Sequence, residues 1–147
     1  MTPAELKGLI RTIPDFPAAG IQFRDITTLI AHGEGLAATV DHLVERARLA
    51  SPAAVAGIEA RGFIFGAAVA ARLELDPGAI DAGERVLLVD DLLATGGTAL
   101  AGAQLLRQAE AVVDHALFVI DLPDLGGGEA LRAAGIEAEA LFDFPGH

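Results

Sequence analysis

Two adjacent carboxylates, Asp90 and Asp91, follow an apolar run and come shortly before a loop of small and hydroxylated residues, ATGGT at 94–98. Carboxylate oxygens accept hydrogen bonds from hydroxyl groups and bind hydrated Mg²⁺. The free backbone N–H groups where a helix begins, together with the helix dipole, bind anions such as phosphate. A ribose 5-phosphate carries both kinds of group. The stretch therefore predicts a site in which the loop holds the 5′-phosphate and the two aspartates hold the ribose hydroxyls.

Each piece of this stretch also has a plainer interpretation. A pair of glycines is most often a turn, and two aspartates after a strand can serve as a helix cap. The complete order of strand, Asp-Asp, Thr-Gly-Gly-Thr and helix is more specific than either piece. It is not a Walker loop, because no Gly-Lys-Ser/Thr follows, and the chain has no Gly-x-Gly-x-x-Gly. We therefore favour phosphate binding at residues 94–98.

The elements that must position these residues alternate along the chain. This alternation predicts an α/β fold, a single-domain parallel sheet flanked by helices, and ligands of such a sheet bind beyond the carboxyl ends of its strands. Residues 14–27 are rich in Pro and Gly and predict an irregular arm with a short strand at most. Helical patterns predict helices at 2–13, 35–50, 62–75, 97–110 and 127–135, and apolar runs predict strands at 53–58, 85–90, 111–121 and 137–144.

Length and composition exclude several classes of protein. The 147 residues, 52% of them hydrophobic, fit one domain with a hydrophobic core. A formal net charge of −11 argues against a nucleic-acid surface, and the lack of cysteine excludes disulfides and thiolate metal sites. No apolar run approaches the roughly 20 residues that span a bilayer, and the N-terminus does not resemble a signal peptide. We expect a cytoplasmic protein with no membrane partner.

Four separate segments carry a resemblance to one enzyme family. The stretch from 89 to 99 resembles the phosphoribosyl-diphosphate (PRPP) motif of the type I phosphoribosyltransferases. Together with FPAAGIQFRDIT (16–27), GIEARGFIFG (57–66) and FPGH (144–147), it is similar to the adenine phosphoribosyltransferase family. The resemblance implies a type I domain with an N-terminal arm, or hood, and a homodimer. It implies transfer of the 5-phosphoribosyl group from PRPP to adenine in purine salvage, which gives AMP and pyrophosphate, with Mg²⁺ carried by PRPP.

The resemblance also implies roles for individual residues around the sugar and its phosphates. Asp90 and Asp91 would hold the ribose hydroxyls and face the positive charge that develops on the sugar. Arg61 would meet pyrophosphate; a surface salt bridge is the alternative, but in so acidic a chain an anion explains an Arg at this place better. The backbone at Glu59 and Ala60, joined by a cis peptide bond, would also meet pyrophosphate. The residues that would cradle the 5′-phosphate are Ala94, Thr95, Gly96, Gly97 and Thr98.

The adenine site implied by the resemblance is built mainly from the arm. Phe23 would stack on the purine, although without the resemblance it reads equally as a core residue. The backbone of Gln22 and Arg24 would read the hydrogen-bonding edge of the base, and Leu125 would close the other face. The four histidines are not at metal-ligand spacing, so we expect no residue of the chain to bind the metal directly, and no general base is assigned.

One part of the family pattern is missing near residues 75–79. There the family has a further strand, a basic segment and a mobile lid, whereas this chain has only DPGAIDAGE (76–84). Either the printed sequence omits a mobile loop, in which case neighbouring Cα atoms will lie much more than about 3.8 Å apart, or the chain lacks the lid. The missing lid favours a second hypothesis, a PRPP- or nucleotide-binding module without turnover. Transfer to another purine base is a third.

Overall fold

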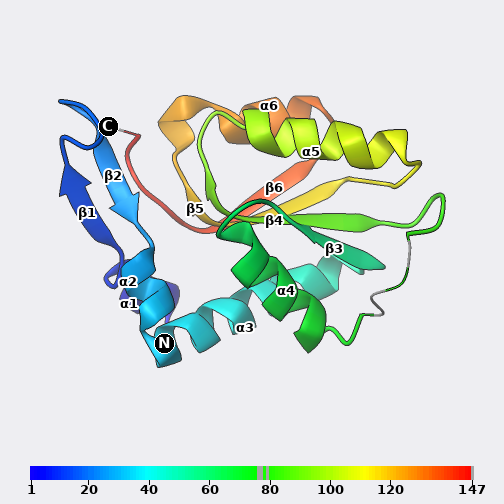
Figure 1. The fold of residues 1–147 in the computed structure, drawn as a ribbon, viewed down its shortest axis with the longest axis horizontal. Helices are drawn as coiled ribbons and strands as arrows, with labels where there is room; N and C mark the ends of the chain where they lie inside the picture. The colour runs from blue at the N-terminus through cyan, green and yellow to red at the C-terminus, as the bar shows by residue number, and fades with distance from the viewer. Residues whose placement is uncertain (76–77, 79, 147) are drawn as a thin grey trace.

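The computed structural model describes residues 1–75, 78 and 80–146. Its centre is a four-stranded sheet in the order β3-β4-β5-β6, in which every neighbouring pair is parallel (Figure 1). The predicted α/β fold with a parallel sheet is confirmed. The strands are β3 (Ala54–Gly57), β4 (Val86–Leu93), β5 (His115–Asp121) and β6 (Glu137–Asp143).

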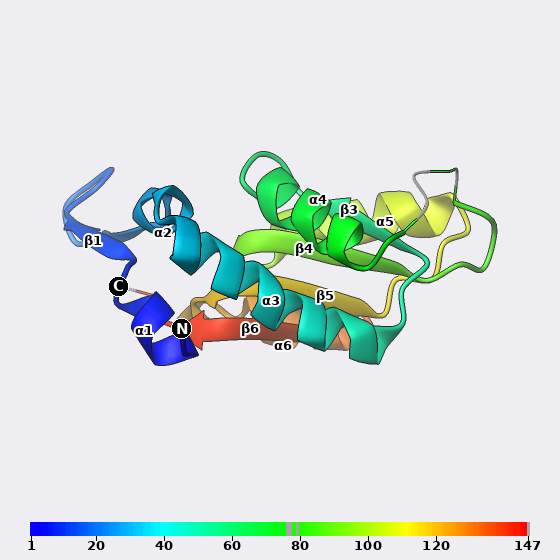
Figure 2. The ribbon, with the colours of Figure 1, turned by 90° about the horizontal axis from the view of Figure 1, so that it is seen from below.

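Helices cover both faces of this sheet (Figure 2). α3 (Gly33–Ala50) and α4 (Gly62–Arg72) pack on one face, and α5 (Gly97–Gln108) and α6 (Gly127–Ala133) on the other. Side chains alternate between the faces along a strand. In β4, Leu87 and Val89 accordingly join the core under α3 and α4, while Val86 and Leu88 join the core under α5 and α6. Burial on both faces explains why the first four residues of this strand, 86–89, are all apolar.

The N-terminal arm differs from the prediction. The capping box of Thr2 and Glu5 starts α1 (Pro3–Lys7) as its sequence suggests, but this helix ends at Lys7 rather than continuing to residue 13. The next residues form β1 (Arg11–Pro14), which pairs antiparallel with β2 (Gln22–Asp25). The prediction of one helix over 2–13 was wrong because strand pairing with a distant segment overrides a local helical pattern.

Asp25 ties the base of this hairpin together. Its carboxylate accepts hydrogen bonds from the hydroxyl and the backbone N–H of Thr27, and it pairs with Arg11 of β1. The Thr27 hydroxyl first, and then Arg11, hold the pKa of Asp25 below its ordinary value. The short helix α2 (Thr27–Ala31), which the sequence pattern did not predict, follows at once. Asp25 therefore joins the two strands of the arm to each other and to the start of α2.

The remaining boundaries differ from prediction by a few residues. The helices predicted to end at 75, 110 and 135 end at Arg72, Gln108 and Ala133. The strand predicted from 111 begins at His115, because Val112 forms only an isolated bridge with Arg85. None of the described helices is long and apolar enough to cross a membrane. The proposed chain break between 75 and 79 falls partly on residues 76, 77 and 79, which lie outside the described residues.

Two leucines of α3, one buried and one exposed, provide a test of this packing. Leu43 is fully buried under the sheet, whereas Leu49 is 87% exposed on the same helix. We expect Leu43→Ala to lower the free energy of unfolding by about 3–5 kcal/mol, because it removes buried methyl groups and leaves a cavity. The control Leu49→Ala should change it by less than about 0.5 kcal/mol. Urea unfolding of both variants measures the difference, and equal losses would contradict the packing described for α3.

Candidate functional site

The two aspartates lie inside β4, near its carboxyl end. The strand was predicted to end at residue 90, but it continues through Leu93 because Leu92 and Leu93 pair with β5. Asp90 and Asp91 are only 9% and 7% exposed. The backbone N–H of Asp91 donates to Asp90 Oδ1 over 2.8 Å. Two carboxylates are thus buried side by side where a ligand of a parallel sheet is expected.

This burial changes the acidity of Asp90. Two causes raise the pKa of Asp90 from 3.8 to about 7: removal from water is the larger, and the contact with the carboxyl group of Asp91 is the smaller. Arg61 acts in the opposite direction but less strongly, and its Nε donates to Asp91 Oδ2. Perturbed carboxylates at the edge of a sheet are a mark of functional sites. Asp90 is therefore partly protonated near neutral pH, and a cation or a hydrogen-bond donor bound beside it would favour its charged form.

Arg61 reaches the aspartates because α4 begins very close to β4. A Cβ atom at Gly62 would lie 2.8 Å from Asp90 Oδ1 and 2.9 Å from the carbonyl oxygen of Val89. Only glycine allows this approach. The Arg61 side chain is 47% exposed, so one side of it remains open to a ligand. The Glu59–Ala60 peptide bond that precedes it is cis, as the resemblance implied.

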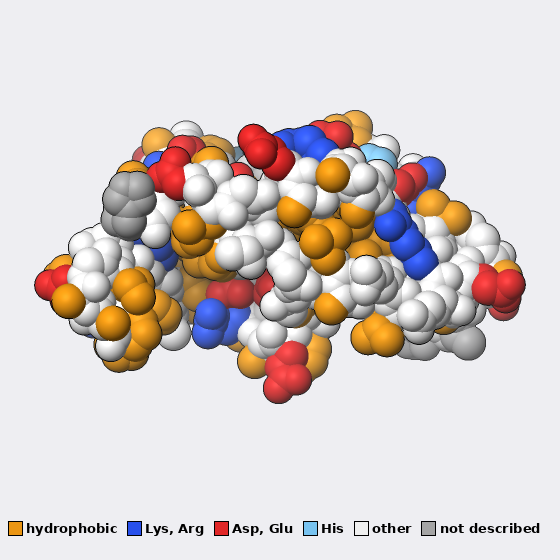
Figure 3. All heavy atoms as spheres, turned by 90° about the horizontal axis from the view of Figure 1, so that it is seen from above, with side chains coloured by type: hydrophobic (Ala, Val, Ile, Leu, Met, Phe, Trp, Pro, Cys, Tyr) orange, Lys and Arg blue, Asp and Glu red, His pale blue; other side chains and the backbone are white. Residues whose placement is uncertain are grey.

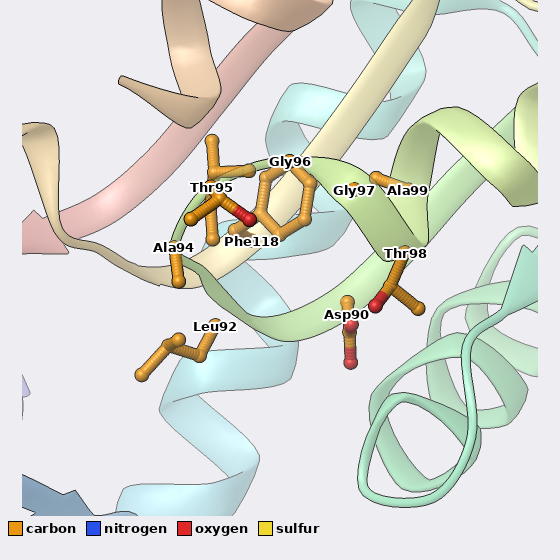
Figure 4. Close-up of a pocket in the computed structure, with 10 residues that line it drawn as sticks. Asp90, Leu92, Ala94, Thr95, Gly96, Gly97, Thr98, Ala99 and Phe118 are labelled. Atoms are coloured by element: carbon orange, nitrogen blue, oxygen red, sulfur yellow. The ribbon is translucent and has the colours of Figure 1, made fainter. Parts of the chain in front are cut away.

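The loop at 94–98 joins β4 to α5 and surrounds a small cavity (Figure 4). Gly96 is the N-cap of α5 with φ of +86°, a left-handed conformation that glycine adopts without strain, and no described side chain caps the helix. The backbone N–H groups at the start of α5 are therefore available to a ligand. The cavity measures about 180 Å³, which suits a phosphate group better than a whole nucleotide. Asp90 and all of residues 94–98 line it.

The start of α6 supports this loop from behind. The N–H of Gly127 donates to the carbonyl oxygen of Ala94 over 3.0 Å. A Cβ atom at Gly127 would lie 2.4 Å from that oxygen, so glycine is needed here too. The sequence did not reveal Gly127, nor that Gly62, a member of the 59–62 segment expected to meet pyrophosphate, also makes room for Asp90. The available signal was a glycine at the start of each helix, and it did not reveal which residue the glycine faces.

The residues expected at the base site lie on other elements. Gln22, Phe23 and Arg24 form most of β2, and Phe23 packs edge-to-face on Phe16 with ring centroids 5.2 Å apart. Phe23 is half-buried and is not part of the buried core. Leu125 is 41% exposed and ends a 3₁₀ turn, η1 (Pro123–Leu125). Figure 3 shows a hollow between the arm and the main body, in which basic and acidic side chains lie together.

Known proteins resemble this chain in both sequence and structure. No family model matches the chain. Adenine phosphoribosyltransferase of Novosphingobium aromaticivorans is 58% identical, with all of both chains covered. The chain belongs to the adenine phosphoribosyltransferase family. The crystal structure of adenine phosphoribosyltransferase from Rhodothermus marinus matches with a TM-score of 0.85 and 34% identity, covering 97% of this chain and 98% of that one. The Saccharomyces cerevisiae enzyme, crystallised with adenine, matches with a TM-score of 0.82 and 28% identity, covering 95% of this chain and 97% of that one.

Relatives in the adenine phosphoribosyltransferase family are longer than this chain. The alignment with the Novosphingobium protein spans 178 positions for the 147 residues here, so 31 positions have no residue in this chain. The family resemblance placed the missing segment near 75–79, and this placement stays a prediction. The elements that carry residues 59–62, 90–91 and 94–98 are all present in the described part of the chain.

The raised pKa of Asp90 makes folding stability depend on pH. The folded protein keeps a proton on Asp90 where the unfolded chain has lost it, so this group lowers stability increasingly as pH rises from about 4 to about 7. We expect Asp90→Asn to be more stable than the parent protein at pH 8, with a smaller gain at pH 5. Urea unfolding across this range measures the stability difference, with Glu137→Gln, an exposed side chain of β6, as control. A gain independent of pH would contradict the assignment.

Proposed function

We propose that this chain transfers the 5-phosphoribosyl group from PRPP to adenine, giving AMP and pyrophosphate. The observation that carries the proposal is the buried Asp90–Asp91 pair beside a phosphate-sized cavity at the start of α5. One ligand with a phosphate and two hydroxyls satisfies both features. Membership of the adenine phosphoribosyltransferase family supports this reaction, with adenine as the base.

The loop at 94–98 is the proposed holder of the 5′-phosphate. Its backbone N–H groups at the start of α5 would donate to the phosphate oxygens, and the helix dipole favours the negative charge. Thr95 and Thr98 would add hydroxyl donors, and Figure 4 shows the Thr98 hydroxyl on the side of Asp90. The phosphate would thus be fixed next to the aspartates, at the distance that one ribose bridges.

The aspartates and Arg61 are the proposed electrostatic part of the site. When pyrophosphate leaves ribose C1, the sugar becomes positive and the leaving group gains negative charge. Asp90 and Asp91 would hold the ribose hydroxyls and stabilise the developing positive charge, while Arg61 would turn from Asp91 toward pyrophosphate. The backbone at 59–62 would add N–H donors to the same group.

Magnesium fits this site as a companion of PRPP. The described residues contain no cluster of three or more His, Asp or Glu that would hold a metal alone, but the Asp90–Asp91 pair offers the oxygen ligands that Mg²⁺ prefers. Bound with PRPP, the ion would supply positive charge to the leaving pyrophosphate.

PRPP carries several charges and does not cross a bilayer unaided, which favours a cytoplasmic location.

The arm and η1 are the proposed adenine site. Phe23 would stack on the purine, and the backbone of Gln22 and Arg24 would pair with its edge. Leu125, partly exposed, would cover the opposite face. Backbone groups offer both donors and acceptors, so hydrogen bonds from the backbone alone would also accept other purines. Guanine and xanthine are therefore tested as competitors in the assay.

The carboxylate pair offers the direct test of the proposal. We expect Asp90→Asn combined with Asp91→Asn to lower AMP formation from adenine, PRPP and Mg²⁺ by about 100-fold or more, because the charge facing the transition state is lost. Folding should survive, since two buried like charges are removed. Asp41→Asn, on the exposed surface of α3, is the matched control. Unchanged turnover in the double variant would make the aspartates structural.

A second function, nucleotide binding without turnover, is favoured by the 31 alignment positions that this chain lacks. Both functions require the phosphate loop and the aspartates, so they differ only in the chemical step. Calorimetric titration with AMP and with PRPP, run beside the AMP-formation assay, separates them. Binding of both ligands with no AMP formed supports the second function and contradicts the first.

A homodimer is the proposed assembly. Phe63 and Ile64, at the start of α4 beside Arg61, are 55% and 41% exposed, and neighbouring exposed apolar side chains mark interfaces. Light scattering at micromolar concentration should give about twice the chain mass of 15.1 kDa. Phe63→Asp should return the mass to that of one chain, whereas Leu49→Asp at the far end of α3 should not. A monomeric parent protein would contradict the proposal.

A further inference from the structure

The ring of Phe144 joins segments that are far apart in the sequence. Lys7 Nζ of α1 and the guanidinium carbon of Arg24 of β2 each lie 4.7 Å from its centroid. A cation at this distance from an aromatic ring is attracted to it. The backbone N–H of Phe144 also donates to the carbonyl oxygen of Asp121, where β5 ends. The ring is therefore anchored to the sheet while two cations of the arm are held against it.

The side chain of Arg24 is fixed at three points. One terminal nitrogen donates to Thr12 Oγ1 over 2.6 Å, the other donates to the carbonyl oxygen of Pro145 over 3.2 Å, and the group lies over Phe144. Only the backbone of Arg24 has a proposed role at the base, and Phe23 precedes it directly. Holding this side chain therefore holds the backbone that would carry the purine contacts.

The other end of the same tail contacts η1. The N–H of Gly146 donates to Asp124 Oδ2 over 3.2 Å. Gly146 also packs on Leu125, because a Cβ atom added there would lie 3.2 Å from Leu125 Cγ. In Figure 1 the chain that leaves β6 runs between β2 and the segment that leads into α6. Residues 144–146, which we name the C-terminal brace, thus touch both the arm and η1.

We propose that the C-terminal brace sets the spacing of the adenine site, with Phe144 as its main positioning residue. This inference rests on the proposed function, because it assumes that Phe23 and Leu125 cover opposite faces of the base. A stack of aromatic ring, purine and aliphatic side chain needs its two walls at a defined separation. Arg24 fixes one wall to the brace, and Asp124 fixes the other. Phe144 itself touches no substrate in this arrangement.

The test compares matched substitutions of two phenylalanines, one near the end of β6 and one just after it. Phe144→Leu keeps an apolar side chain and removes the ring, so KM for adenine should rise about 10-fold while KM for PRPP and kcat stay within 2-fold. Phe142→Leu, a buried core position two residues earlier, should lower stability without this selective rise. Phe144→Tyr keeps a ring and should restore KM for adenine. An equal rise in both KM values, or a fall in kcat alone, would overturn the proposal.

Hydrogen exchange separates this proposal from the proposed function. Amide exchange in residues 11–25 should be faster in Phe144→Leu than in Phe142→Leu, whether or not the protein forms AMP. Faster exchange in a protein that forms no AMP supports the brace and removes the catalytic proposal. Unchanged exchange in residues 11–25 overturns the brace, even in an active enzyme.

Discussion

The burial of Asp90 and Asp91 in a central strand is the constraint on which the site depends. Placing two carboxylates where they are less than a tenth exposed costs free energy, and the raised pKa of Asp90 is the sign of that cost. Part of it is offset by the Asp91 N–H on one carboxylate and by Arg61 on the other. Arg61 can take this position only because Gly62 lets α4 start against β4. The absence of a side chain at Gly62 thus decides where the charged residues lie.

The phosphate loop depends on the same kind of close approach. Gly96 turns the chain into α5, and Gly127 leaves room for the carbonyl oxygen of Ala94 behind it. The loop is thereby held by α6, which belongs to a later part of the chain. Its N–H groups keep a fixed direction before any ligand arrives, and donors that are already oriented stabilise developing charge without reorganisation. The pairing of a prearranged loop with buried carboxylates is what favours phosphoribosyl transfer over a simple anion site.

Local patterns predicted the parts of the fold that are locally determined. The apolar run before Asp90 indicated a strand buried on both faces, and the Thr-Gly-Gly-Thr stretch indicated a helix start with free N–H groups. The prediction failed at 8–13, where pairing of Arg11 with Asp25 and of β1 with β2 outweighs a helical pattern. The packing roles of Gly62, Gly127 and Phe144 could not be assigned, because each acts on residues that are distant in the sequence. The family resemblance supplied the cis bond at 59–60, for which the residues alone carry no signal.

The described elements divide the proposed site into a half built on the sheet and a half built on the arm. Asp90, Asp91 and the loop at 94–98 belong to β4 and to the start of α5, and the core on both faces of the sheet stabilises them. Apart from Leu125 on η1, the base residues belong to a two-stranded hairpin, which on its own is marginally stable. The hairpin therefore needs contacts outside itself. Arg24 supplies one by lying over Phe144, whereas the ion pair of Arg11 with Asp25 joins the two strands of the hairpin to each other. Phosphate binding thus depends on the stability of the domain, whereas base binding depends on how firmly the arm is attached.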